Sequence, residues 1–138
     1  MTGAEVVVQE ARRWLQFSAE DLEVAQRLLT DRLSAPRHVC WLSQQAAEKA
    51  LKAALVLEDI EFPYTHDLRR LRNLVPGAWP AGAGPDILAR LTEWGAESRY
   101  PGDWPEPSAR EAAQAQADAR AVYDSIAAEF GRRGLSLE

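Results

Sequence analysis

HVCWLSQQAAEKALKAALVLEDIEFPYTHDL, residues 38–68, is the stretch that decides the fold of this chain. It reads as one long helix to about Glu58, a short loop, and a histidine, His66, just before another helix. At about 100° per residue, one side of the long helix is apolar and rich in alanine. That side holds Val39, Leu42, Ala46, Ala50, Ala53 and Leu57, and is widened by Ala47 and Ala54. Since alanine leaves little bulk between helix axes, the pattern predicts a central helix with close neighbours.

The opposite edge of the same helix is polar. It carries Gln45, Glu48, Lys49 and Lys52, with Trp41 and Leu55 among them. Glu48 and Lys52 are i,i+4 neighbours in the order that favours an ion pair. One interpretation is an ordinary solvated edge of a bundle helix. The other is a polar edge that lines a groove or a dimer seam.

Helical periodicity continues through the rest of the chain, and no strand pattern competes with it. The expected helices are 5–30, 36–58, 66–75, 85–97 and 108–130. Thr65 can cap the third helix, with Asp67 in its first turn, and Ser108 with Glu111 forms a capping box for the last. Pro76–Pro85 reads as a loop. The sequence therefore predicts an all-α, up-and-down bundle of three long and two short helices.

Length and composition limit the functional classes. A chain of 138 residues with 46% hydrophobic residues fits a single domain, 1–138, with a core of about 5–130 and a tail of 131–138. There is no transmembrane run and no signal-peptide pattern at the N-terminus. The single cysteine, Cys40, lies on the apolar side of its helix and is expected to be inert in a reducing, cytoplasmic setting. A net charge of −5 argues against a broad nucleic-acid surface.

Three segments together resemble the HEPN family of small all-α domains. They are QQAAEKALKAALV, then PYTHDLRRL, then SRYP before the last helix, and the similarity spans roughly residues 10–130. The resemblance implies a bundle that homodimerises and, in many members, a partner that is a separate minimal nucleotidyltransferase. Many members are metal-independent ribonucleases of toxin–antitoxin or defence systems. Those carry an arginine, four to six residues, and then a histidine, whereas other members lack the motif and are non-catalytic.

Arg99 matches the arginine of that motif, but the histidine is missing. The three positions where it would stand hold Trp104, Pro105 and Glu106. Attack of a ribose 2′-OH on phosphate needs a general base and a cation, and a missing base typically costs about 10²–10⁴ in rate. Arg32 and His38 match the spacing by coincidence, in the wrong part of the chain.

The resemblance and the polar edge together predict one polar groove at or near the dimer seam. Nucleotide or phosphate would be bound by Lys49, Lys52, His66 and Arg99, of which Arg99 is the candidate catalytic residue. The groove would also be lined by Gln45, Glu48, Asp67 and Tyr100. For His66, a structural role beside the Thr65 cap and a role as phosphate contact or substitute base both stay open, and Asp67 is expected to be a helix N-terminal charge. Glu106 is a weaker candidate for a replacement base.

Other chemistries lack the necessary residues. No helical ligand spacing supports a metal site, and there is no glycine-rich phosphate loop or nucleophile elbow, so no metal and no cofactor is expected. The hypothesis is a non-catalytic or partner-regulated HEPN homodimer in a toxin–antitoxin-like module. It would bind a nucleotidyltransferase chain, with nucleotide or RNA as a further ligand and no membrane. The alternative is a metal-independent endoribonuclease that uses Arg99 with an atypical base.

Overall fold

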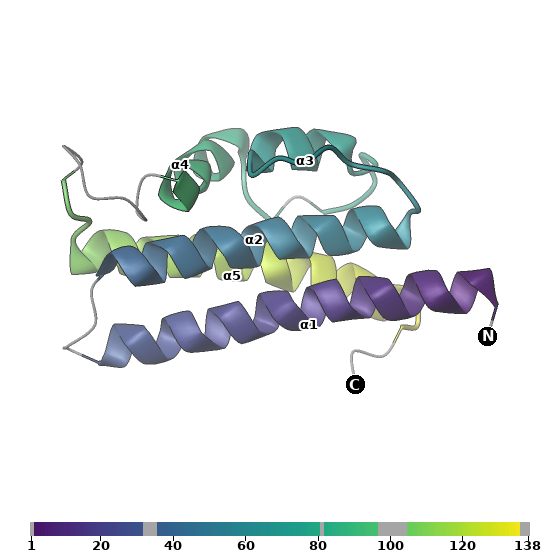
Figure 1. Cartoon of the computed structure of the whole chain (residues 1–138), viewed down its shortest axis with the longest axis horizontal. Coiled ribbons are helices and arrows are strands. Elements are labelled where there is room, and N and C mark those ends of the chain that lie inside the picture. The colour runs from purple at the N-terminus through teal and green to yellow at the C-terminus, as the bar shows by residue number, and fades with distance from the viewer. Residues whose placement is uncertain (1, 32–35, 81, 97–104, 136–138) are drawn as a thin grey trace.

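The part of the chain that the structure describes forms five helices and no strand. A computed structural model describes residues 2–31, 36–80, 82–96 and 105–135. The helices are α1 (Gly3–Thr30), α2 (Pro36–Leu57), α3 (Leu68–Leu74), α4 (Pro85–Ala96) and α5 (Ala109–Arg132). The long helices α1, α2 and α5 run side by side, and the short α3 and α4 lie on the far side of α2 from α1 (Figure 1). The predicted all-α bundle of three long and two short helices is confirmed.

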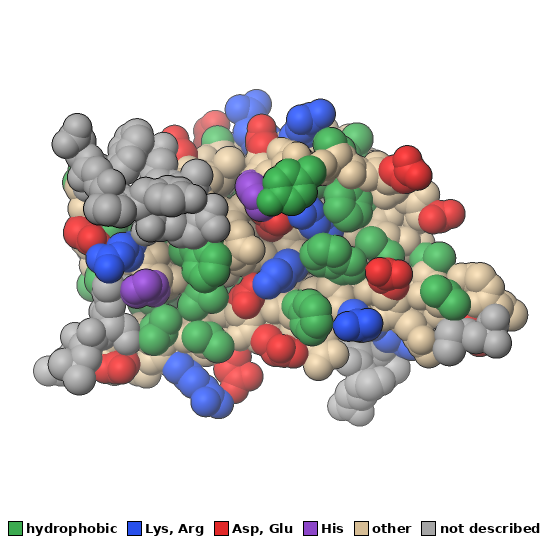
Figure 2. All heavy atoms as spheres, viewed as in Figure 1, with side chains coloured by type: hydrophobic (Ala, Val, Ile, Leu, Met, Phe, Trp, Pro, Cys, Tyr) green, Lys and Arg blue, Asp and Glu red, His purple; other side chains and the backbone are tan. Residues whose placement is uncertain are grey.

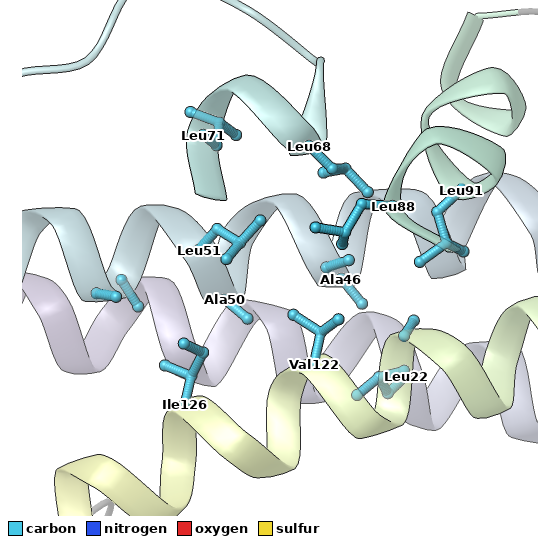
Figure 3. Close-up of a cluster of buried hydrophobic side chains, with 14 of the residues drawn as sticks. Leu22, Ala46, Ala50, Leu51, Leu68, Leu71, Leu88, Leu91, Val122 and Ile126 are labelled. Carbon is cyan, nitrogen blue, oxygen red and sulfur yellow. The ribbon is translucent and has the colours of Figure 1, made fainter. Parts of the chain in front are cut away.

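Helix α2 is the centre of the bundle and contacts each of the other four helices. The alanines of its apolar side are fully buried, whereas Leu42 and Leu57 on the same side are partly buried. Figure 3 shows Ala46 and Ala50 of α2 facing Val122 and Ile126 of α5. Leu51, on the other side of α2, points toward α3 and α4. The small alanine side chains let the large aliphatic side chains of α5 fill the space between the two helix axes.

Two predictions about helix ends have different outcomes. The Ser108–Glu111 capping box is present in full, with Glu111 N donating to Ser108 Oγ and Ser108 N donating to Glu111 Oε1. The cap of α3 was wrongly expected to be Thr65. Asp67 is the N-cap and accepts hydrogen bonds from the backbone of Arg69 and Arg70, whereas Thr65 accepts one from Asp67 N. The aspartate carboxylate is an equally good cap, and it starts the helix two residues later than expected.

The predicted tail and the predicted Pro/Gly loop are more ordered than the sequence suggested. Trp79, in that loop, is buried and packs edge-on against Phe130, with ring centres 6.1 Å apart. Helix α5 continues to Arg132, and the guanidinium of Arg133 lies 4.5 Å from the centre of the Trp79 ring while pairing with Glu58. The assignment of 131–138 as a tail was therefore wrong for its first residues, because a cation–π contact and an ion pair hold Arg133.

Gly95 sets how closely α4 approaches α2. A Cβ at this position would lie 2.8 Å from Cδ of Gln44, whose side chain is buried and hydrogen-bonded and so cannot move aside. We expect Gly95→Ala to lower the free energy of unfolding by about 1–3 kcal/mol, as overpacking does.

The matched control for Gly95→Ala is Gly131→Ala, also within a helix, where a Cβ meets nothing within 4 Å. That substitution should stabilise by about 0.5–1 kcal/mol, because alanine loses less conformational freedom in a helix. Urea unfolding of both variants measures the difference. Equal effects of the two substitutions would contradict the close approach of α4 to α2.

Candidate functional site

The Glu48 carboxylate is the centre of a polar cluster on α2, which we call the Glu48 cluster: Gln44, Glu48, Lys52 and His66. Lys52 Nζ lies 2.9 Å from Glu48 Oε2, and His66 Nδ1 lies 2.7 Å from Glu48 Oε1. Gln44 Nε2 donates to Glu48 Oε1 at 3.1 Å and to the backbone oxygen of His66 at 3.0 Å. Both oxygens of the buried carboxylate therefore have partners, and the segment before α3 is fastened to α2.

These partners keep Glu48 ionised. Burial alone would raise the pKa of the carboxyl group. The hydrogen bonds from Lys52, His66 and Gln44, together with the charge of Lys52, outweigh burial and hold the pKa of Glu48 below its ordinary value. The cluster is thus a buried anion whose charge is balanced by a buried lysine.

Lys52 is enclosed on its other sides by aromatic rings. Its ammonium lies 5.6 Å from the ring centre of Trp14 and 5.5 Å from that of Phe62, two rings that pack edge-on against each other. The side chain is only 8% exposed. A ligand phosphate would have to displace the Glu48 carboxylate to reach this ammonium, so the geometry favours a role for Lys52 in holding Glu48.

His66 is the member of the Glu48 cluster that reaches the surface, with 45% of its side chain exposed. Its ring lies edge-on against Tyr64, with ring centres 5.3 Å apart, and Tyr64 is 90% exposed. Figure 2 shows this face, where a histidine lies beside an aromatic ring and cationic side chains lie among hydrophobic ones. Because the ionised Glu48 carboxylate can only accept, Nδ1–H is the donor in this hydrogen bond, and Nε2 is the ring nitrogen that the bond does not use. An oriented imidazole of this kind can contact phosphate or accept a proton.

The other predicted groove residues lie on the same edge of α2 or at the start of α3. Lys49 Nζ is 2.7 Å from Asp21 Oδ2 of α1, in a partly buried ion pair. Gln45 Nε2 donates to Gln44 Oε1 at 2.8 Å. Asp67 caps α3 and is exposed. The structure thus brings together Gln45, Glu48, Lys52 and His66, with Lys49 one step along the helix.

The motif segment is only partly described. Arg99 and Tyr100 lie outside the described residues, and so does Trp104, so their places in the predicted site stay predictions. Glu106 is exposed and pairs with Arg37, Nη1 to Oε1, at 2.7 Å. His38, the coincidental match, is exposed near the start of α2.

One interpretation of the polar edge was wrong. Glu48 and Lys52 are not solvated, because the segment from Glu58 to Asp67 folds back over them and brings His66 and Phe62 onto α2. Gln44 and the aromatic wall of Trp14 and Phe62 were not predicted from the sequence. The available signal was the i,i+4 spacing of Gln44 and Glu48, one turn before Lys52.

Several chemistries find no support in the described part of the chain. It contains no group of three or more His, Cys, Asp or Glu side chains placed to hold a metal ion. Burial, with a smaller effect of the charge on Glu111, raises the pKa of the Cys40 thiol to about 12, so this cysteine stays protonated. None of the described helices has both the length and the apolar character needed to span a membrane.

Comparison with known proteins identifies the class. The model of the HEPN domain matches residues 11–129, most of the chain, and the protein therefore belongs to the HEPN domain family. The chain is similar to ST0689, an archaeal HEPN homologue, with 25% identity and a TM-score of 0.68 over 86% of this chain and 96% of that one. It is also similar to TT1696 from Thermus thermophilus, with 26% identity and a TM-score of 0.72 over 86% of this chain and 97% of that one. No curated protein matches at a significant level.

Removal of the Glu48 charge should destabilise the protein at neutral pH. Glu48→Gln leaves Lys52 buried without its anion, and we expect a loss of about 3 kcal/mol in the free energy of unfolding. Combination with Lys52→Met should recover part of that loss, because the uncompensated charge is then gone. The control is Glu23→Gln, which breaks an exposed pair with Arg27 and should cost less than about 1 kcal/mol.

The pH dependence of the same variants follows from the lowered pKa. Since the pKa of Glu48 is lower in the folded state than its ordinary 4.5, the stabilisation is complete above that value and is lost as the pH falls below it. The difference in the free energy of unfolding between wild type and Glu48→Gln, measured with urea, should therefore become smaller as the pH is lowered from 7. A constant difference would show that the Glu48 charge has no part in stability.

Proposed function

We propose that the chain is a non-catalytic HEPN subunit that forms a homodimer and binds a separate minimal nucleotidyltransferase chain. Nucleotide or RNA would be a further ligand, and the pair would act as a toxin–antitoxin-like module. The proposal that the chain is non-catalytic rests on the residues at positions 104–106, where the histidine of the motif would follow Arg99. Trp104 and Pro105 cannot take a proton from a 2′-OH, and the carboxylate of Glu106 is already paired with Arg37.

An arginine without a base can bind but cannot easily catalyse. Arg99 supplies a cation that stabilises phosphate oxygens, whereas the attacking 2′-OH must still lose its proton. The guanidinium of Arg37 lies 2.7 Å from Oε1 of the Glu106 carboxylate, so a substrate hydroxyl would have to compete with an existing ion pair for that oxygen. Retention of the arginine alone is consistent with phosphate binding.

The purified protein should cleave RNA weakly or not at all. The measurement is incubation with structured and unstructured RNA, with and without EDTA, beside Arg99→Ala. Loss of RNA binding in that variant, without cleavage by either protein, is the expected result. Robust metal-independent cleavage that disappears in Arg99→Ala would overturn the non-catalytic proposal.

One observation favours the ribonuclease alternative, and the same assay examines it. Glu48 orients His66 by its Nδ1, as a carboxylate does for a catalytic histidine, and leaves Nε2 toward the exposed side. His66→Asn keeps an N–H donor near Nδ1 but removes Nε2, so cleavage lost in this variant with the fold intact would assign the base to His66. Absence of cleavage in wild type excludes the alternative.

An apolar stripe on the outer side of α1 supports the homodimer. Val6, Phe17 and Val24 are each 42–48% exposed. At about 100° per residue they lie within about 20° of one line along the helix. Arg13 lies on the same line, with its guanidinium 5.9 Å from the centre of the Phe17 ring, so the stripe carries one cation among its apolar side chains. Exposed apolar side chains that share one side of a helix are typical of a surface that another chain covers.

Light scattering tests the homodimer. Wild type should have twice the 15.3 kDa mass of the chain, and Phe17→Glu and Val24→Glu should be monomeric, because a charge in an apolar interface loses its hydration. Gln26→Glu, exposed on another side of α1, is the control and should stay dimeric. A wild-type mass of 15.3 kDa at all micromolar concentrations would contradict the homodimer.

Co-expression with the neighbouring genes tests for the nucleotidyltransferase partner, which should co-elute with the chain as a larger complex.

A further inference from the structure

A groove of about 460 Å³ lies between α3, the loop after it and the start of α4. Arg69, Arg72 and Asn73 form its polar wall, and Val75, Ala83 and Leu88 form its apolar lining. Val75 and Leu88 are themselves buried core residues, so the bottom of the groove is rigid. Its size falls in the range of groove and cleft sites that take a small molecule or a short peptide segment.

The polar wall carries positive charge that no carboxylate among the described residues balances. The guanidinium of Arg72 is fixed by hydrogen bonds to the backbone oxygens of Val75 at 3.3 Å and Trp79 at 3.0 Å, which neutralise no charge. Arg69 lies exposed, and among the described residues no carboxylate pairs with it. By contrast Arg27, Arg90 and Arg133 all have acidic partners. In a chain of net charge −5, α3 therefore carries a local group of cations, and Figure 2 shows blue side chains above α3 with acidic ones beside them.

We propose that this groove binds an acidic peptide segment of a protein partner, with an aliphatic side chain seated on the apolar lining and carboxylates facing Arg69 and Arg72. None of the described lining residues is acidic, so nothing in the groove repels a carboxylate. None is aromatic, so the groove lacks the stacking surface on which nucleobases are bound. Such a peptide can therefore form ion pairs with the arginines and bury an aliphatic side chain, whereas a nucleic acid can form only the ion pairs.

This inference rests on the proposed function in one respect, that the chain works by binding a protein partner. The groove shares no residue with the Glu48 cluster or with the apolar stripe on α1. Its occupant would therefore bind without competing with the homodimer surface or with a ligand at His66. The charge and the apolar lining of the groove define the kind of peptide segment that a partner would bind with, and they do not depend on which protein the partner is.

The experiment is selection of a displayed library of random dodecapeptides on the immobilised full chain. Enriched peptides should carry two or more Asp or Glu residues close to Leu, Ile, Val or Met. A synthetic peptide of that sequence should bind wild type, and Arg69→Glu should weaken binding on the order of ten-fold or more. Binding should also weaken as the salt concentration rises.

Two further variants separate the groove from the rest of the surface. Gly84→Leu fills the groove from a position where an added Cβ meets nothing within 4 Å, so it should abolish binding and leave the thermal unfolding curve unchanged. Arg110→Glu reverses an exposed charge on α5 that does not line the groove, and should bind as wild type does.

Failure has distinct signatures. No enrichment, enrichment without acidic residues, or binding that Arg69→Glu leaves within two-fold would each overturn the inference. If no acidic peptide binds, and an oligoribonucleotide binds wild type but not Arg69→Glu, the inference is overturned and the ligand is a phosphate. Peptide binding at the groove without a co-eluting nucleotidyltransferase would uphold the groove and reject the proposed partner.

Discussion

Burial of most of α2 is the constraint on which the rest of this structure depends. Because α2 contacts all four other helices, a polar group on it must find its partner inside the protein or lose its hydration without compensation. Glu48 meets that condition with three partners, and one of them, His66, comes from the segment before α3. The same hydrogen bonds that stabilise the buried carboxylate also hold the segment before α3 against α2 and orient the imidazole.

The five helices could be predicted because their signals are local. Apolar periodicity, Pro36 and the Ser108 capping box each act over one or two turns, and the observed bounds differ from the expected ones by at most two residues. The alanine side of α2 was equally readable, since small residues at helical spacing have few other uses.

The candidate site could be predicted only in part, because it depends on how distant segments meet. A helical wheel gives the angle of Lys52 but not the return of Phe62 over it, which turned an expected surface lysine into a buried one. Trp79 was missed for the same reason, since composition places Pro76–Pro85 in a loop but says nothing of the core beneath that loop. The positive wall of the groove likewise needs α3 and α4 side by side.

The surfaces of this HEPN domain differ in what they can recognise. The His66 face offers one oriented imidazole beside an exposed aromatic ring, α1 offers aliphatic and aromatic side chains, and the α3–α4 groove offers unpaired guanidinium charge. Binding needs only such complementary groups, whereas catalysis needs a proton acceptor held against a reacting atom. The described residues are richer in the former, which is the basis of the proposed binding role.

The position of α5 after the other four helices in the sequence has a consequence during synthesis. Helices α1 and α2 are adjacent in sequence and can pair as soon as they leave the ribosome, but Ala46 and Ala50 of α2 also face Val122 and Ile126 of α5. At typical rates of translation the interval between residues 57 and 132 lasts roughly 4–15 s, during which these alanines lack their neighbours on α5. A nascent chain that stalls before α5 would therefore expose this part of α2.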